Sequence, residues 1–122
     1  MNEFSVIRRF FHRPLNHPDV ALGIRDDAAL VDTLPGRQWA ICTDTMVEGV
    51  HFLPTAPADS VGWKAVAVNL SDLAAMGATP VWITLALTLP RIDTAWLDAF
   101  SQGLFALCDT FHVDLIGGDL TS

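Results

Sequence analysis

Basic side chains are scarce in this sequence of 122 residues. Seven lysines and arginines stand against fourteen aspartates and glutamates, which gives a formal charge of −7, and Lys64 is the only lysine. Because nucleic-acid binding depends mostly on clustered cations that neutralise backbone phosphates, we expect no nucleic-acid partner. An acidic protein of this kind still binds a polyphosphate if metal ions lie between the two sets of negative charges.

Long apolar runs are also missing. The hydrophobic content is 51%, but the apolar stretch at residues 81–89 is interrupted by threonines and is far shorter than the ~20 residues that span a bilayer. The N-terminus lacks the uninterrupted apolar core and small-residue cleavage site of a secretory signal. We therefore expect a cytoplasmic protein that does not associate with membranes.

Several common site motifs are absent as well. The two cysteines, Cys42 and Cys108, are not in C-x-x-C spacing, so we expect reduced, packed thiols. The sequence contains no G-x-x-x-x-G-K-[ST] loop, no protein-kinase glycine loop, no nucleophile elbow and no H-E-x-x-H motif. The familiar phosphate cradles and hydrolase sites built on these motifs are therefore excluded.

Hydrophobic periodicity and turn residues predict seven elements in a chain whose length fits one domain. The three predicted helices span residues 3–12, 59–76 and 93–111, with Asp59 and Asp93 as N-caps and Gly77 following the second helix. The four predicted strands span residues 28–31, 39–43, 79–89 and 113–116, and the first two are expected to form a hairpin.

This order of elements predicts an α+β fold. We expect a mixed or antiparallel sheet of about four strands with helices on one face. No other element of the chain is available for the second face of the sheet, so we expect a dimer partner to cover it.

Four acidic residues share a setting that suits metal binding: Asp27, Asp44, Asp72 and Asp119. Three of them lie at predicted strand ends, while Asp72 shares a helix face with Asn69. Magnesium needs only one or two carboxylates for each ion and takes its other ligands from water and phosphate. A single aspartate in a turn more often bonds nearby backbone amides, however. The remaining aspartates of the helices and the last strand, Asp98, Asp109 and Asp114, are expected on a solvated face.

Two further features leave alternatives open. The Gly117-Gly118-Asp119 sequence lets backbone amides approach a phosphate, but a glycine pair after a strand is more often a simple turn. His51 lies between Val50 and Phe52 and is as often a core residue as a ligand-facing one.

Three runs of sequence resemble a known family. They are CTDTMVEGVHF at residues 42–52, KAVAVNLSDLAAMGA at 64–78 and LIGGD at 115–119. In order and spacing they resemble the motifs of thiamine-monophosphate kinases, and with the opening helix and residues 85–90 the resemblance covers essentially the whole chain. The wider superfamily is similar to aminoimidazole-ribonucleotide synthetase, and the first two runs favour the thiamine enzyme within it.

The resemblance implies an enzyme that phosphorylates thiamine monophosphate to thiamine diphosphate with ATP, by magnesium-assisted in-line transfer. It implies a site for several magnesium ions with these ligands: Asp27, Cys42, Thr43, Asp44, Asp72 and Asp119. Cys42 stands where a serine is usual in the family. His51 is the implied contact to the thiamine phosphate, and Gly118 with Asp119 is the implied nucleotide-binding turn. No catalytic base is expected, because the acceptor is already an anionic phosphate oxygen.

The resemblance also implies a domain organisation. Residues 1–122 correspond to an N-terminal domain for metal and ATP binding and for homodimer formation, and the C-terminal domain of the family is absent from this chain. We expect the chain alone to be inactive. Arg25 stands where the family has a glycine, next to Asp26 and Asp27. The alternatives are another ATP-using member of the superfamily and a non-catalytic dimerisation module whose metal site has decayed.

Overall fold

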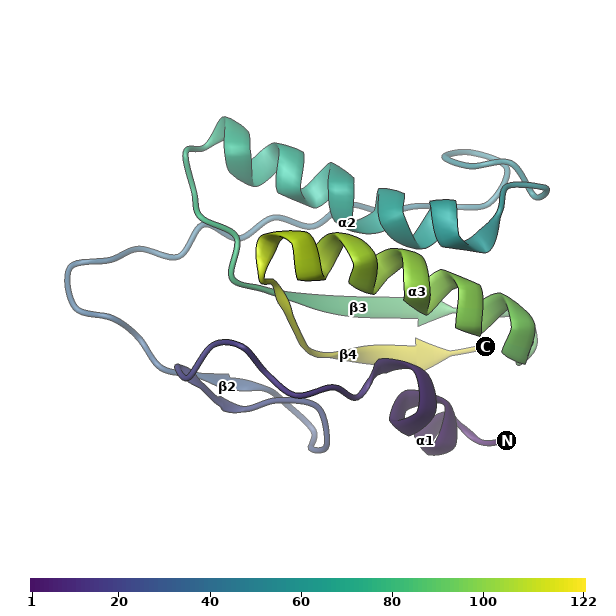
Figure 1. Cartoon of the computed structure of the whole chain (residues 1–122), viewed down its shortest axis with the longest axis horizontal. Helices are drawn as coiled ribbons and strands as arrows, with labels where there is room; N and C mark the ends of the chain where they lie inside the picture. Colours follow the sequence, from purple (N-terminus) through teal and green to yellow (C-terminus); the bar gives the residue numbers. More distant parts are fainter. The chain divides into compact units, whose positions relative to one another are not determined.

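The chain folds into two compact units. The computed structural model describes all 122 residues, and the first unit consists of Met1–Gln38, Val81–Ile92 and His112–Ser122, while the second consists of Trp39–Pro80 and Asp93–Phe111. All four strands belong to the first unit and both long helices belong to the second (Figure 1). The expected α+β class is confirmed.

The first unit opens with a short helix that changes its winding. Helix α1 (Glu3–Val6) continues directly into η1 (Ile7–Phe11), which has the wider π-helical turn. The Asn2 side chain caps α1, since its Oδ1 accepts a hydrogen bond from the backbone N–H of Ser5 at 2.9 Å. The predicted helix at residues 3–12 is confirmed; Val6, Phe10 and Phe11 are buried, whereas Phe4 is exposed.

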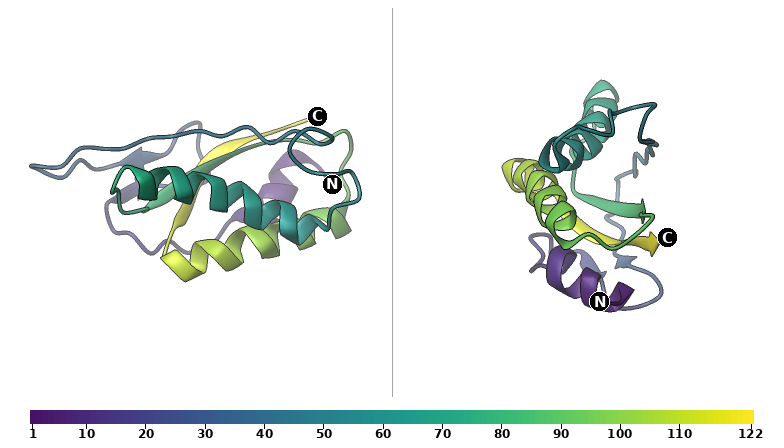
Figure 2. Two further views of the ribbon diagram at one scale, coloured as in Figure 1. Left: turned by 90° about the horizontal axis from the view of Figure 1, so that it is seen from above. Right: turned by 90° about the vertical axis from the view of Figure 1, so that its right-hand side faces the viewer.

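The strands of the first unit form two separate pairs rather than one sheet. β1 (Val20–Leu22) pairs antiparallel with β2 (Leu30–Val31), and β3 (Trp82–Thr88) pairs parallel with β4 (Asp114–Thr121). Two further views show β3 and β4 side by side (Figure 2). A parallel pair requires a long connection, and the helical segment between the two strands in the sequence provides it.

The predicted hairpin of residues 28–31 with residues 39–43 is wrong. β2 pairs instead with β1, which the sequence did not reveal, and residues 39–43 form no strand. Residues 35 and 36 form a turn between these two segments, with Gly36 at φ +73°. A turn of this kind is specified locally, whereas the choice of a pairing partner depends on chain segments far from the turn.

The second unit contains two long helices, α2 (Ala58–Ala75) and α3 (Thr94–Phe111), that lie side by side (Figures 1 and 2). Their backbones touch at two glycines. A Cβ on Gly62 would overlap the carbonyl oxygen of Phe100, and a Cβ on Gly103 would overlap that of Asp59. Glycine is therefore required at both contacts. Neither helix, nor any other in the chain, combines the length and apolar character that crossing a membrane demands.

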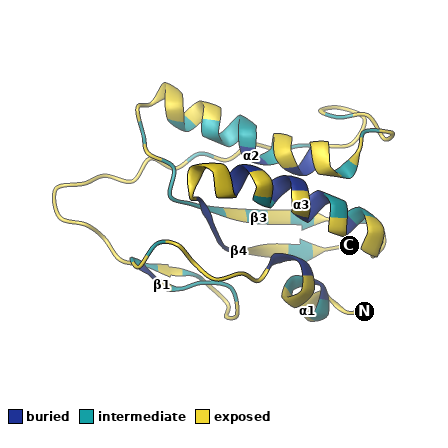
Figure 3. Cartoon of the chain, in the orientation of Figure 1, coloured by how far each residue is buried: buried dark blue, intermediate teal, exposed yellow.

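The core of this unit lies along one face of α3. Leu97, Leu104 and Cys108 are almost completely shielded from solvent, as is Val66 of α2, and Figure 3 shows the buried stripe on α3. The hydrophobic periodicity of residues 93–111 thus corresponds to a buried face in the central part of α3, while Phe111 at the end of the helix is exposed.

The helix ends are set by local chemistry. Asp93 is the predicted N-cap of α3, and its Oδ1 accepts from the N–H of Trp96 at 3.1 Å. Gly77 follows α2 with φ +68° and closes the helix in a Schellman arrangement, in which the N–H groups of residues 77 and 78 donate to carbonyls of residues 74 and 73 at 3.0 and 2.9 Å.

The predicted N-cap of α2 is wrong. The helix begins at Ala58, after Pro57, and Asp59 already lies in its first turn. The Asp59 carboxylate accepts from the N–H of Ser60 at 2.9 Å. Pro57 occupies the N-cap position, with φ −57° and ψ 135°.

Candidate functional site

Two of the predicted metal ligands, Asp44 and Asp72, come together in the second unit. A hydrogen bond between their carboxyl groups raises the pKa of Asp44 above its ordinary value. Loss of water and the negative charge of Asp72 raise the pKa of Asp44 further, and nearby His51 partly offsets this. Carboxylates this close favour a shared proton or a bound cation between them. Two of the predicted ligands therefore interact directly, while their role in metal binding stays a prediction.

Cys42 lies beside this pair. Its Sγ donates to the carbonyl oxygen of Asn69 at 3.7 Å and to the Oδ1 of the same residue at 3.6 Å. Burial raises the pKa of the Cys42 thiol above its ordinary value, and the charges of Asp72 and Asp44 raise it further. A protonated thiol is a poor ligand for a hard ion such as magnesium. The adjacent residue Thr43 is exposed.

His51 lies in a tight turn of the same unit. Its backbone N–H donates to the carbonyl of Val47 at 2.8 Å, while the N–H of Val47 donates to His51 Nδ1 at 2.9 Å. Gly49, at φ +82°, donates to the carbonyl of Phe52 at 2.7 Å. The His51 side chain is exposed, so the alternative of a core histidine is wrong.

Lys64 of α2 contacts this turn, although no sequence motif assigns it a role. Its Nζ donates to the carbonyl oxygen of His51 at 2.6 Å. One feature of the sequence could have indicated a role for Lys64: it is the only lysine of the chain and is the first residue of the family-like run at 64–78.

Gly118 and Asp119 lie within strand β4 of the first unit. The expectation that the strand ends at Ile116 in a turn is wrong, because β4 continues to Thr121. Gly118 has φ +141°, and a Cβ on it would overlap the carbonyl oxygen of Leu85 on β3. The close approach of the two strands therefore explains the glycine. Asp119 pairs with Ala86 in the ladder and is exposed.

Asp27 lies in the loop between β1 and β2 and is exposed. Its backbone N–H donates to the side chain of Asp26 at 2.8 Å. Further along this loop, the Cβ of Ala29 lies 3.7 Å from the position that a Cβ on Gly117 would occupy. The loop that carries Asp27 thus runs beside the part of β4 that carries Asp119.

Arg25 has a backbone conformation that suits glycine. Its φ is +144°, a region that residues with a side chain rarely occupy and that costs about 1–3 kcal/mol. Arg25 is therefore accommodated in a strained turn, two residues before Asp27.

Asp114 is buried, contrary to the expectation of a solvated residue. It is 3% exposed at the start of β4. Its carboxylate accepts from the backbone and side-chain nitrogens of Asn16 at 2.8 and 3.0 Å and from the N–H of His17 at 2.8 Å. His17 Nε2 also lies 2.6 Å from the carbonyl oxygen of His112. These bonds tie the segment before β1 to β4, which is a structural role.

The predicted ligands are divided between the two units. Cys42, Thr43, Asp44 and Asp72 belong to the second, whereas Asp27 and Asp119 belong to the first. The structure assembles no group of three or more His, Cys, Asp or Glu side chains suited to holding a metal ion. The complete ligand set therefore stays a prediction.

Comparison with known proteins gives consistent matches. The family model "AIR synthase related protein, N-terminal domain" matches residues 25–122. The thiamine-monophosphate kinase of Salmonella typhimurium is 54% identical over 120 residues and that of Haemophilus influenzae 52% over 122 residues, with 98% and 99% of this chain covered. This chain spans 37% of the length of each of these two relatives.

Solved structures agree with these relatives. A thiamine-monophosphate kinase from Stenotrophomonas maltophilia K279a matches with a TM-score of 0.85 and 48% identity, over 98% of this chain and 38% of that one. The structure of AaThiL complexed with AMPPCP and TMP matches with a TM-score of 0.54 and 36% identity, over 62% of this chain and 25% of that one.

Proposed function

This chain belongs to the AIR synthase related protein family, whose N-terminal domain it carries, and from this premise we propose that it is part of a thiamine-monophosphate kinase. The proposed reaction moves the terminal phosphate of ATP to thiamine monophosphate and yields thiamine diphosphate and ADP. The observation that carries the proposal is the carboxylate pair of Asp44 and Asp72, because these residues come from two of the runs that resemble this family. The identity of 54% to an enzyme of that name supports it.

We propose ATP and thiamine monophosphate as the two substrates. A similar protein, AaThiL, was solved complexed with AMPPCP and TMP. His51 would contact the phosphate of thiamine monophosphate, and Gly118 with Asp119 would contact the phosphates of the nucleotide. The exposure of these three residues supports both assignments, since each is accessible to a ligand.

Magnesium is the proposed metal, and the donor set fits it. The proposed ligands offer hard oxygen atoms, as magnesium requires: Asp27, Thr43, Asp44, Asp72 and Asp119. The pKa of Asp44 is raised mainly by the hydrogen bond to Asp72, then by burial and by the negative charge of Asp72, and a divalent ion would offset that charge. The protonated Cys42 would contribute at most its backbone. When bound, magnesium ions supply charge neutralisation for the transferring phosphate.

The residues of the chain need not include a general base. The acceptor of the reaction is a phosphate monoester, whose second pKa is about 6, so its attacking oxygen is ionised at neutral pH. The remaining task for the protein is to bind and align two phosphate groups. The absence of a nucleophile or base motif in the sequence agrees with this requirement.

The proposal extends to partners and location. We propose a homodimer in the cytoplasm with no nucleic-acid partner. The net charge of −7 supports the last point. Large apolar side chains such as Ile41, Val50 and Leu53 are more than two-thirds exposed, which supports an association surface.

The test is the conversion of thiamine monophosphate by the complete protein that carries this chain. We expect magnesium- and ATP-dependent formation of thiamine diphosphate, measured by fluorescence after oxidation to the thiochrome. Asp44→Asn and Asp72→Asn should each abolish it while circular dichroism shows an unchanged fold. Near-normal turnover by both variants would refute the metal assignment.

Two control measurements separate the alternatives. Turnover of an aminoimidazole-ribonucleotide precursor without turnover of thiamine monophosphate would assign the protein to another branch of the superfamily. Failure to bind magnesium-nucleotide in calorimetry would indicate a non-catalytic dimerisation module. The strained backbone of Arg25 is the one observation that favours this last alternative.

A further inference from the structure

A side chain of helix α2 bonds to the turn that carries His51. Lys64 Nζ donates to the backbone carbonyl of His51 at 2.6 Å. Inside the turn, hydrogen bonds link Val47 with His51 and Gly49 with Phe52. The turn is therefore internally closed, and the bond from Lys64 connects it to the long helix that also carries Asp72.

The bond from Val47 determines the tautomer of the His51 ring. A backbone N–H is only a donor, so Nδ1, 2.9 Å from the nitrogen of Val47, must be the acceptor and carries no proton. In the neutral imidazole the proton then lies on Nε2. The exposed ring of His51 thus offers Nε2–H as a hydrogen-bond donor to a ligand.

His51 also lies near the carboxylate pair. It is close enough to lower the pKa of Asp44 electrostatically, against the larger effects that raise it. A ligand held by cations at Asp44 and Asp72 would therefore have this ring beside it. An anionic phosphate oxygen is an acceptor that suits an Nε2–H donor.

We propose that Lys64 is a positioning residue. By holding the carbonyl of His51 it keeps the turn on α2, preserves the bond from Val47 to Nδ1, and so presents the Nε2–H of His51 to a phosphate monoester. The identity of that phosphate as thiamine monophosphate rests on the proposed function, whereas the control of the ring by Lys64 does not.

The first test reads the ring directly. In the complete protein labelled with ¹⁵N-histidine, long-range ¹H–¹⁵N correlation spectra at a pH where the ring is neutral report which nitrogen carries the proton, and His51→Gln identifies the signal. We expect the Nε2–H form in the unaltered protein. Lys64→Met, which keeps the length of the side chain and removes the ammonium, should give a mixture of both tautomers, and Lys64→Arg should restore the Nε2–H form.

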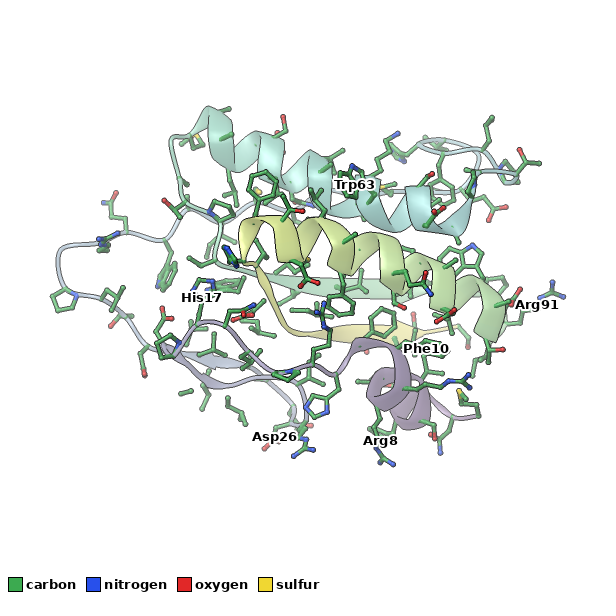
Figure 4. All side chains as sticks on the ribbon, in the orientation of Figure 1. Arg8, Phe10, His17, Asp26, Trp63 and Arg91 are labelled. Atoms are coloured by element: carbon green, nitrogen blue, oxygen red, sulfur yellow. The ribbon has the colours of Figure 1, made fainter.

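The second test is kinetic. Lys64→Met should raise the KM for thiamine monophosphate about fivefold, the effect of losing one ordinary hydrogen bond, while the KM for ATP, kcat and Tm change little. Lys64→Arg should recover most of the loss. Arg8→Met is the matched control: it also removes one cation, from an exposed residue of the first unit whose side chain points away from its helix (Figure 4), and should leave both KM values unchanged.

The outcomes distinguish the two proposals. An Nδ1–H ring in the unaltered protein, or Lys64→Met spectra and KM values equal to those of the parent, would overturn the positioning role. A fall in Tm with equal losses for both substrates would also overturn it, since it would indicate a purely structural bond. If the spectra change as expected but no variant, nor the parent, phosphorylates thiamine monophosphate, the positioning role stands and the proposed function fails.

Discussion

Arg25 shows how one residue can strain a turn next to proposed ligands. Its φ of +144° suits glycine, and its guanidinium adds a permanent positive charge two residues before Asp27. Two separate costs follow, one from the backbone conformation and one from repulsion between the arginine and a nearby cation.

Substitution separates these costs. Arg25→Gly should raise the free energy of unfolding by about 1 kcal/mol, because strain is relieved, and should lower the magnesium concentration for half-maximal turnover. Arg25→Ala is the matched control, since it removes the charge but keeps a Cβ in the same backbone conformation. Urea unfolding and magnesium titration of activity measure the two effects. Equal stability of the Gly and Ala variants would show that the backbone conformation costs nothing.

The Asp44–Asp72 pair makes stability depend on pH in an unusual direction for aspartate. The folded pKa of Asp44 is raised, mainly by the hydrogen bond to Asp72. The contribution of this group to stability is therefore present below its unfolded pKa and is lost as pH rises through the folded pKa. At neutral pH without metal, the negative charge of Asp72 disfavours the ionised form of Asp44.

Removal of one charge from the pair should relieve this repulsion. In EDTA at pH 7, Asp72→Asn should raise the Tm, and the gain should vanish as pH falls below the unfolded pKa of aspartate. Asp32→Asn, in an exposed loop, is the control for loss of one negative charge. Thermal melts from pH 7 to below the unfolded pKa of aspartate measure this gain in Tm. A gain that is independent of pH would contradict the electrostatic cause.

Residues of the site differ in how far the sequence revealed them. The setting of Asp44 and Asp72 and the family-like runs both point to these residues, whereas only the runs assign His51 to a ligand; the structure places Asp44 beside Asp72 and exposes His51. Asp114 was placed incorrectly on a solvated face. Its burial depends on donors from Asn16 and His17, which lie 98 and 97 positions away, so no local pattern reveals it.

At the scale of elements, the two helices of the second unit depend on backbone contact. Gly62 and Gly103 have no room for a methyl group, and the atoms that a methyl would meet belong to the opposite backbone. A flexible side chain could move to make room for a methyl group, but backbone atoms cannot. The two packed helices would have to move apart.

Gly62→Ala should therefore destabilise the protein, despite the higher helix propensity of alanine. We expect a loss of about 1–3 kcal/mol, the usual cost of overpacking. Ser60→Ala, at an exposed position of the same helix, should change stability by less than about 0.5 kcal/mol. The free energies come from urea unfolding, and a neutral Gly62→Ala would mean that the helices have room to move apart.

The ends of the helices were predictable where neighbouring residues determine them. Both ends of α3 and the C-terminal end of α2 fall within one residue of the expected positions, because a capping aspartate, a positive-φ glycine and apolar periodicity all lie in neighbouring residues. Strand pairing was not predictable in this way. β1 has three residues and β2 has two, which is too short for an alternating pattern to be recognised.

At the scale of the whole molecule, the parallel pair of β3 and β4 has one side of β3 open to solvent. Thr84, Ala86 and Thr88 alternate with less exposed residues along the strand. An exposed strand face next to unpaired strand edges favours association with another chain. This is the surface on which we expect a second copy to bind.

Sedimentation tests this expectation. The protein should sediment as a dimer at micromolar concentration, and Ala86→Lys should convert it to a monomer, because a charge buried at an interface is unfavourable. Ala106→Lys, on the exposed side of α3, should leave the dimer intact. Only monomer in the unaltered protein, or a dimer that survives Ala86→Lys, would contradict this surface.

The bonds between Asp114 and the segment before β1 have a consequence for the order of folding during synthesis. They connect residues 98 positions apart, and both long helices are made in the interval between them. A chain that leaves the ribosome from its N-terminus therefore holds Asn16 and His17 without their acceptor until α3 is complete. Every residue of the second unit precedes position 112, so this unit can fold early. The first unit includes His112–Ser122, so it must wait for these residues and depends more on protection while translation proceeds.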